Sequence, residues 1–218
     1  MGLAPYGKPR FKDLIIKELI DLKNDGSFRL NMKYFNYATG LTMTNDKFSK
    51  LFGQKARNPE KDLLTQFHMD IAASIQSVTE EIVLRLASSI FKETKIKNLC
   101  MAGGVALNCV ANGKILKRNI FENIWFQPAA GDAGGSLGAA LAFWYQELGN
   151  KRKAVASGDS MKGSYLGPSF KDDQVEKILN SLGAKYEKKD EDSLINTVAD
   201  HLKNKKTIGW FQGRMEFG

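Results

Sequence analysis

Two glycine-rich turns, each between an apolar extended run and a helical pattern, constrain this chain most. In the first, residues 98–102 read as the end of a strand, Gly103-Gly104 as a turn, and the residues from Val105 as a helix. Glycine has no Cβ, so such a turn lets the backbone approach a ligand closely. Free N–H groups at the start of a helix suit a phosphate group. The pattern therefore favours a phosphate-binding joint between a strand and a helix.

The second turn carries a carboxylate. Asp132 stands just before Gly134-Gly135 and an alanine-rich helical stretch. A carboxylate at this point can cap the helix or bind a hard cation. We interpret the two turns as two walls of one nucleotide and metal site. Two well-packed strand–turn–helix joints without a ligand fit the same spacing, because isolated glycine-rich turns are weak signals.

The composition describes a globular chain without membrane or secretion signals. With 218 residues, of which 43% are hydrophobic, it can form one large domain or two small ones. No apolar run in the sequence is long enough to cross a bilayer, and the first residues lack the apolar region of a secretory signal. We predict a cytoplasmic protein with no membrane partner. Cys100 and Cys109 show no metal-ligand spacing and are predicted to be reduced, partly buried thiols.

The chain is basic, with a formal net charge of +8. Its basic clusters are Lys151-Arg152-Lys153, Lys188-Lys189 and Lys203-Lys205-Lys206. They are dispersed and interleaved with acidic residues, and no nucleic-acid-binding motif accompanies them. We therefore predict solvated faces with a general attraction for anionic ligands, and no nucleic-acid partner.

Hydrophobic periodicity predicts alternating helices and strands. The longest helical pattern covers residues 60–92, contains no Gly or Pro, and is expected to carry the core. Other predicted helices cover residues 11–22, 46–52, 105–117, 133–148, 172–182 and 194–202, and predicted strands lie within 27–37 and at 97–102, 123–126, 185–187 and 207–211. This alternation favours an α/β architecture. Residues 149–163 are short, polar and basic, which is typical of a linker.

A series of motifs, in matching order, resembles the nodulation-protein and cephalosporin O-carbamoyltransferase family. They are MGLAPYG (Met1–Gly7), YFNYATGL (Tyr34–Leu41), FG (Phe52-Gly53), LCMAGGVALNCVANGKI (Leu99–Ile115), FQPAAGDAGGSLGAAL (Phe126–Leu141), YLGP (Tyr165–Pro168) and GWFQGRMEFG (Gly209–Gly218). Each motif alone is weak, but together they cover nearly the whole chain.

The resemblance implies part of a two-domain α/β enzyme. Residues 1–155 would be the latter part of an actin/sugar-kinase-like (ribonuclease H-like) ATPase domain. Residues 156–218 would be the truncated start of a second α/β domain, which forms carbamoyl-adenylate from ATP and carbamoyl phosphate. The ATPase-like part then passes the carbamoyl group to a hydroxyl of a sugar or secondary metabolite. The implied partners are carbamoyl phosphate and a hydroxyl-bearing small molecule, and a homodimer is a candidate assembly.

The resemblance also assigns nucleotide contacts. Gly103, Gly104 and Asn108 match the family's nucleotide-contacting turn and helix start. Gly134 and Gly135 match the glycines beside the adenylate. These residues are therefore the predicted nucleotide-binding set, with ATP as the cofactor.

Two further positions carry over. Asp132 matches the metal-ligand aspartate of the family, which implies a divalent metal, iron or another, besides the magnesium that accompanies ATP. Arg214 falls where the second domain gathers phosphate-binding basic groups, and could grip a phosphate in bidentate fashion. A metal can polarise the reacting carbonyl or activate the hydroxyl, and backbone N–H groups can stabilise the charge on the leaving AMP. No catalytic residue is assigned.

The chain departs from the full family pattern. The family's histidine ligands lie upstream of the APYG motif and are absent, while His68 and His201 read as structural or surface residues. We therefore expect a fragment that by itself neither transfers carbamoyl groups nor holds metal tightly.

Two other functions fit the glycine turns. A sugar-kinase-like phosphotransferase of the same superfamily would use them for ATP, but it needs an acceptor-activating aspartate in a proximal lobe that this chain does not contain. A non-catalytic nucleotide-binding module needs no further residues, because one Asp and several Gly do not make an active site.

Overall fold

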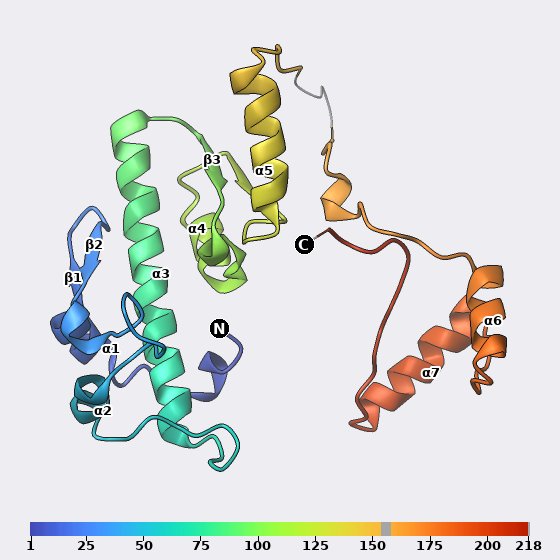
Figure 1. Cartoon of the computed structure of the whole chain (residues 1–218), viewed down its shortest axis with the longest axis horizontal. Helices are drawn as coiled ribbons and strands as arrows, with labels where there is room; N and C mark the ends of the chain where they lie inside the picture. The colour runs from blue at the N-terminus through green and yellow to red at the C-terminus, as the bar shows by residue number, and fades with distance from the viewer. Residues whose placement is uncertain (154–157, 218) are drawn as a thin grey trace. The chain divides into compact units, whose positions relative to one another are not determined.

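The computed structural model describes residues 1–153 and 158–217, in two compact units, Met1–Gly131 and Asp132–Gly218 (Figure 1). The domain boundary predicted between residues 155 and 156 lies outside the described residues.

The long helix α3 (Gln66–Thr94) is the centre of the first unit, as the periodicity predicts (Figure 1). It begins six residues later than expected, because Asp62 instead closes a turn by accepting the Asn58 N–H at 2.7 Å. Thr65 is the N-cap, and its N–H donates to His68 Nδ1 at 3.0 Å. The helix ends at Lys95, whose left-handed φ of 56° breaks the helical path.

The segment before α3 is more irregular than predicted. It contains the 3₁₀ turn η1 (Ala4–Tyr6), α1 (Lys12–Leu14), the π turn η2 (Ile15–Leu19), the strands β1 (Ile20–Leu22) and β2 (Phe28–Leu30), and the 3₁₀ turn η3 (Met32–Tyr34). The helix predicted over residues 11–22 is wrong at its end, because residues 20–22 pair antiparallel with β2. The hairpin turns at Gly26, whose φ is 92°; a Cβ there would lie 2.5 Å from the Leu86 nitrogen.

Helix α2 (Asp46–Phe52) is confirmed at its predicted bounds. The side chain of Asn45 accepts the N–H groups of Lys47 and Phe48, and Gly53 ends the helix with a φ of 70°. This is the Asn cap and left-handed Gly that the sequence offers. α2 packs into a cluster formed by Ile15, Leu19, Ile20, Tyr34, Phe52, Val78 and Ile82.

A strand–turn–helix–strand segment follows α3. It consists of β3 (Asn98–Met101), the 3₁₀ turn η4 (Gly104–Leu107), α4 (Cys109–Arg118) and β4 (Asn123–Phe126). β3 and β4 pair in parallel, with Leu99 opposite Ile124. The predicted strands are confirmed, whereas the helix expected from Val105 starts at Cys109, after η4. A second cluster joins α3, α4 and the sheet: Val83, Ala87, Leu99, Ala111, Ile115 and Phe121.

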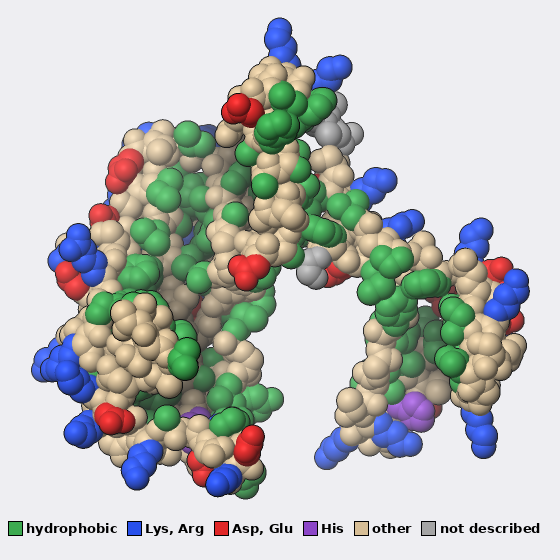
Figure 2. Space-filling view, in the orientation of Figure 1, with side chains coloured by type: hydrophobic (Ala, Val, Ile, Leu, Met, Phe, Trp, Pro, Cys, Tyr) green, Lys and Arg blue, Asp and Glu red, His purple; other side chains and the backbone are tan. Residues whose placement is uncertain are grey.

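The regular elements described in the second unit are all helical. It contains α5 (Gly134–Ala142), the π turn η5 (Phe143–Glu147), the 3₁₀ turn η6 (Lys162–Ser164), α6 (Asp172–Ser181) and α7 (Glu191–Lys203). The strands predicted at 185–187 and 207–211 are wrong, since neither segment is a strand in the described chain. A strand requires a hydrogen-bonded neighbour, and alternation alone does not supply one. Figure 2 shows hydrophobic side chains on the surface of this unit. Ile178 and Leu182 are among its exposed residues.

Mixed helices and small sheets confirm the α/β class. The actin/sugar-kinase-like ATPase fold stays a prediction. Cys100 and Cys109 are both exposed, so the expectation of partly buried thiols is wrong. Among the described residues, no helix combines the length and the apolarity needed to cross a bilayer.

Candidate functional site

The candidate site begins where the two parallel strands end. β3 leads into the Gly103-Gly104 turn, and β4 leads into residues 127–131. Since parallel strands place their carboxyl ends at one edge, the loops that follow them lie at the same edge of the sheet, the edge at which α/β sheets bind ligands. The Gly103 N–H donates to the Ala130 carbonyl at 2.8 Å. This hydrogen bond holds the first turn against the loop that leads to Asp132.

The first glycine turn presents open backbone. Gly103 has a φ of 94°, a conformation that side chains rarely adopt. Apart from the adjoining residues of the chain, no described atom lies within 4 Å of a Cβ placed on Gly103 or Gly104. The first hydrogen bond of η4 runs from the Ala106 N–H to the Gly103 carbonyl, at 2.9 Å. The N–H groups of Gly104 and Val105 precede it and are therefore available to a ligand.

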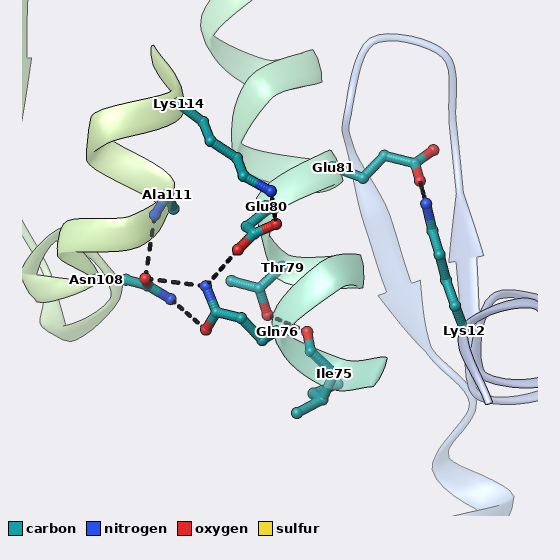
Figure 3. Close-up of polar contacts among 9 residues, drawn as sticks. All are labelled: Lys12, Ile75, Gln76, Thr79, Glu80, Glu81, Asn108, Ala111 and Lys114. Carbon is teal, nitrogen blue, oxygen red and sulfur yellow. Dashed lines mark hydrogen bonds and ion pairs between the residues drawn. The ribbon is translucent and has the colours of Figure 1, made fainter. Parts of the chain in front are cut away.

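Asn108 joins this turn to α4. Its Oδ1 accepts the Ala111 N–H at 3.2 Å, which makes Asn108 the N-cap of α4 (Figure 3). It also exchanges two hydrogen bonds with Gln76 of α3: Gln76 Nε2 donates to Asn108 Oδ1 at 3.1 Å, and Asn108 Nδ2 donates to Gln76 Oε1 at 3.0 Å. The structure therefore gives Asn108 a positioning task. Its predicted nucleotide contact stays a prediction.

The polar contacts continue from Gln76 along α3. Gln76 Nε2 also donates to Glu80 Oε1 at 2.8 Å, and Lys114 of α4 forms an ion pair with the other oxygen of Glu80 (Figure 3). The Glu80 side chain is only 9% exposed. We call Lys114, Glu80, Gln76 and Asn108 the polar chain. The sequence analysis missed it, because its members lie on two helices and up to 38 positions apart (114 − 76).

Among the described residues, two buried acceptor atoms near the loops have no hydrogen-bond partner. Asn112 Nδ2 donates to the Ala106 carbonyl of η4 at 2.7 Å, but Asn112 Oδ1 has no hydrogen-bond partner among the described residues. Gln127 Oε1, at the start of the loop after β4, is likewise buried without a described partner. An unpaired buried acceptor carries an energetic penalty, so each such atom is a point where a water or a ligand donor would be favourable.

Asp132 opens the second unit and is exposed. Its carbonyl accepts the Gly135 N–H at 3.0 Å, but the residue before α5 is Ala133, and no side chain caps this helix. The capping alternative for Asp132 is therefore not realised. Gly134 and Gly135 form the first turn of α5, and no described atom lies within 4 Å of a Cβ on Gly135.

The described residues do not assemble a metal site. Among them, no three His, Cys, Asp or Glu side chains come together as metal ligands. His68 is engaged at the start of α3, where Nδ1 accepts the Thr65 N–H. Its structural role is as the sequence predicts. His201 lies in the last turn of α7. Asp132 can thus offer one carboxylate, which by itself selects no metal.

Arg214 has a structural partner. Its Nη1 donates to the Gly167 carbonyl at 2.6 Å, so the YLGP and GRMEFG motifs meet within the second unit. The backbones reinforce this contact, because the Gly167 N–H donates to the Met215 carbonyl and the Met215 N–H donates to the Pro168 carbonyl, each at 2.9 Å. The predicted phosphate contact of Arg214 stays a prediction.

The MGLAPYG motif is held by polar residues of α3 that the sequence analysis also missed. Asp70 Oδ1 accepts the Lys8 N–H at 2.8 Å, and Gln66 Nε2 donates to the Tyr6 carbonyl at 3.1 Å. A Cβ on Gly7 would lie 2.0 Å from the Met69 carbonyl oxygen, so only glycine fits. A usable signal was present, since Gln66 and Asp70 stand one helical turn apart and therefore share one face of the predicted helix.

Comparisons with known proteins agree with the motifs. The family model described as Carbamoyltransferase N-terminus matches residues 1–141. A protein of Synechocystis sp. that is described as uncharacterised is 58% identical over 220 residues, all of this chain but 35% of the relative. Nodulation protein NolO of Bradyrhizobium diazoefficiens is 35% identical over 221 residues, which is 37% of its length. The nodulation protein NolNO of Sinorhizobium fredii is 35% identical over 30% of its length. The chain thus spans about a third of these relatives.

Proposed function

The chain belongs to the carbamoyltransferase N-terminus family, and on this premise we propose that it is the nucleotide-holding part of an O-carbamoyltransferase. The proposed donor is carbamoyl phosphate, activated with ATP as carbamoyl-adenylate. The proposed acceptor is a hydroxyl group of a sugar or another metabolite. Catalysis is proposed for the whole protein, since the chain covers about a third of its longer relatives.

The hydrogen bond between the two loops is the observation that carries the proposal. The Gly103 N–H meets the Ala130 carbonyl at the carboxyl edge of the parallel strands, so the two family motifs meet at one place. The open backbone at Gly103 and Gly104 fits a phosphate, because neither residue has a Cβ that would keep a ligand away. In the proposed reaction, the N–H groups of Gly104 and Val105 hold and stabilise the phosphate of the leaving AMP.

A divalent metal at Asp132 fits less well. One exposed carboxylate is present, and the described residues supply no group of three ligands around it. We therefore propose Asp132 as a single ligand whose companions lie outside the described residues, and we derive no chemical step from the metal.

The test compares two glycines of the first unit in the intact protein. Gly103→Ala and the control Gly53→Ala both place a methyl group at a positive φ, 94° and 70°, with no described atom within 4 Å. Strain is larger at Gly103, whose ψ of 157° lies in a region that essentially only glycine adopts, than at Gly53, whose ψ of 16° is left-handed helical. The melting temperature of both variants is therefore measured beside binding, and Gly53 ends α2, away from the loops. We expect Gly103→Ala to weaken ATP and AMP binding, measured by calorimetry, by about tenfold or more, and Gly53→Ala to leave it unchanged.

Carbamoyl transfer is then measured with labelled carbamoyl phosphate, ATP and a panel of sugars. Loss of transfer in Gly103→Ala and its retention in Gly53→Ala are expected. The proposal is overturned if Gly103→Ala binds nucleotide and transfers the label as the parent protein does. Phosphorylation of an acceptor by ATP without carbamoyl phosphate would instead favour a phosphotransferase.

A further inference from the structure

The polar chain stands out in a contact that is otherwise apolar. Around it, α3 and α4 pack through Val83, Ala87, Ala111 and Ile115. As whole residues, Gln76 and Glu80 are 9% and 7% exposed, close to the 8% of their apolar neighbour Val83. Burying an amide and a carboxylate is costly unless each finds partners, and apolar residues would join two helices at lower cost. Stability alone therefore does not account for these residues.

The hydrogen-bond pattern leaves the Gln76 amide one orientation. Nε2 donates both of its hydrogens, one to Glu80 Oε1 and one to Asn108 Oδ1, while Oε1 accepts from Asn108 Nδ2. If the amide turned over, its oxygen would face the Glu80 carboxylate, and two acceptors would meet. Lys114 supplies the opposite charge that Glu80 requires where it is buried. Glu80 thus orients Gln76, and Gln76 orients Asn108.

Asn108 connects these side chains to the Gly103-Gly104 turn. It lies between the two elements, as the C-cap of the η4 turn and the N-cap of α4, four positions after Gly104. Its N–H donates to the Val105 carbonyl at 2.9 Å, while its side chain caps α4. Fixing the Asn108 side chain therefore fixes the end of the segment that starts at Gly103.

We propose that Gln76 and Glu80 are positioning residues for nucleotide binding: acting through Asn108, they set the geometry of the Gly103-Gly104 turn. This inference rests on the proposed function, in which that turn holds the nucleotide. Neither residue contacts the ligand. Their effect on nucleotide affinity should therefore exceed what their effect on stability explains, because a well-packed but misaligned turn binds poorly.

Three variants of the intact protein separate positioning from stability. Gln76→Leu keeps about the same side-chain volume and removes both hydrogen bonds between Gln76 and Asn108. Glu80→Gln keeps an acceptor for Gln76 and removes only the ion pair with Lys114, so it serves if Gln76→Leu fails to fold. Ile82→Val is the control, since Ile82 is 8% exposed on the same helix and belongs to the other apolar cluster. Melting temperature and the KM and kcat for ATP are measured for each.

We expect Gln76→Leu to raise KM for ATP about five- to tenfold with a smaller change in kcat, and Glu80→Gln to raise it about two- to threefold. Ile82→Val should lower the melting temperature without changing KM. The positioning role is overturned if both polar-chain variants keep the parent KM. In that case Gly103→Ala decides what else has failed. If Gly103→Ala also keeps the parent KM for ATP, the proposed function is overturned as well; if Gly103→Ala raises this KM, only the positioning role is overturned.

Discussion

Asp70 shows how one carboxylate can hold the segment that follows the MGLAPYG motif. Its side chain is 4% exposed; Oδ1 accepts the Lys8 N–H and Gln66 Nε2, and Oδ2 lies 3.2 Å from Arg10 Nε. The Lys8 amide first, then Gln66, and then the charge of Arg10 lower the pKa of Asp70 below its usual value of 3.8. The folded state therefore favours the ionised carboxylate.

Asp70→Asn should remove a pH-dependent part of the stability. Because the folded pKa is lowered, the contribution of Asp70 is complete above the unfolded value of 3.8 and is lost as the pH falls through the folded pKa. The melting temperature of the parent chain should exceed that of the variant near neutral pH, and the difference should shrink below about pH 4. Thermal unfolding followed by circular dichroism at several pH values measures this. A difference that stays constant down to the lowest pH would contradict it.

The two sides of helix α4 differ in burial, and we expect them to contribute differently to the free energy of unfolding. Ile115 is fully buried against α3 and the sheet, whereas its neighbour Leu116 is 65% exposed. Ile115→Ala should lower the free energy of unfolding by about 2–5 kcal/mol, from lost burial and the cavity left behind. The matched control Leu116→Ala should change it by about 0.5 kcal/mol or less. Urea denaturation of both variants measures the difference, and similar losses would mean that α4 packs differently.

Elements were predictable from the sequence where local signals and packing agree. α2 has an Asn cap and a closing Gly, and β4 has a compact apolar run; both lie at their predicted bounds. Residues 20–22 continue a helical period, yet pairing with β2 overrides it. The glycine turns could be read from glycine alone. The polar chain could not, because Gln76 meets Asn108 through the packing of two helices.

The whole molecule combines two units of different internal packing. The first has two apolar clusters. In the described part of the second, neither α6 nor α7 has a buried residue. Few buried contacts mean a low free energy of local opening.

The match of the family model to residues 1–141 confirms the resemblance drawn from the motifs, while the roles of single site residues stay predictions.

Hydrogen exchange should reveal this difference directly. We expect amides in the middle of α3 to exchange at least about tenfold more slowly than those of α6 and α7, because opening α3 disrupts both clusters. Exchange of the 218-residue chain followed by mass spectrometry measures it, with residues 54–64, all exposed except the half-buried Arg57, as an internal fast reference. Equal protection of α3, α6 and α7 would show that the second unit has a core of its own.

The close approach of the Gly7 backbone to helix α3 limits how α3 can be grafted onto another protein. A methyl group on Gly7 would collide with the Met69 carbonyl oxygen, so the backbone of the entry segment touches that of α3 without an intervening side chain. If α3 is grafted onto another scaffold together with the segment of residues 1–8 that packs against it, Gly7 must therefore be kept. Any larger residue at position 7 would push this segment away from α3 and break the hydrogen bond between the Lys8 N–H and the Asp70 carboxylate.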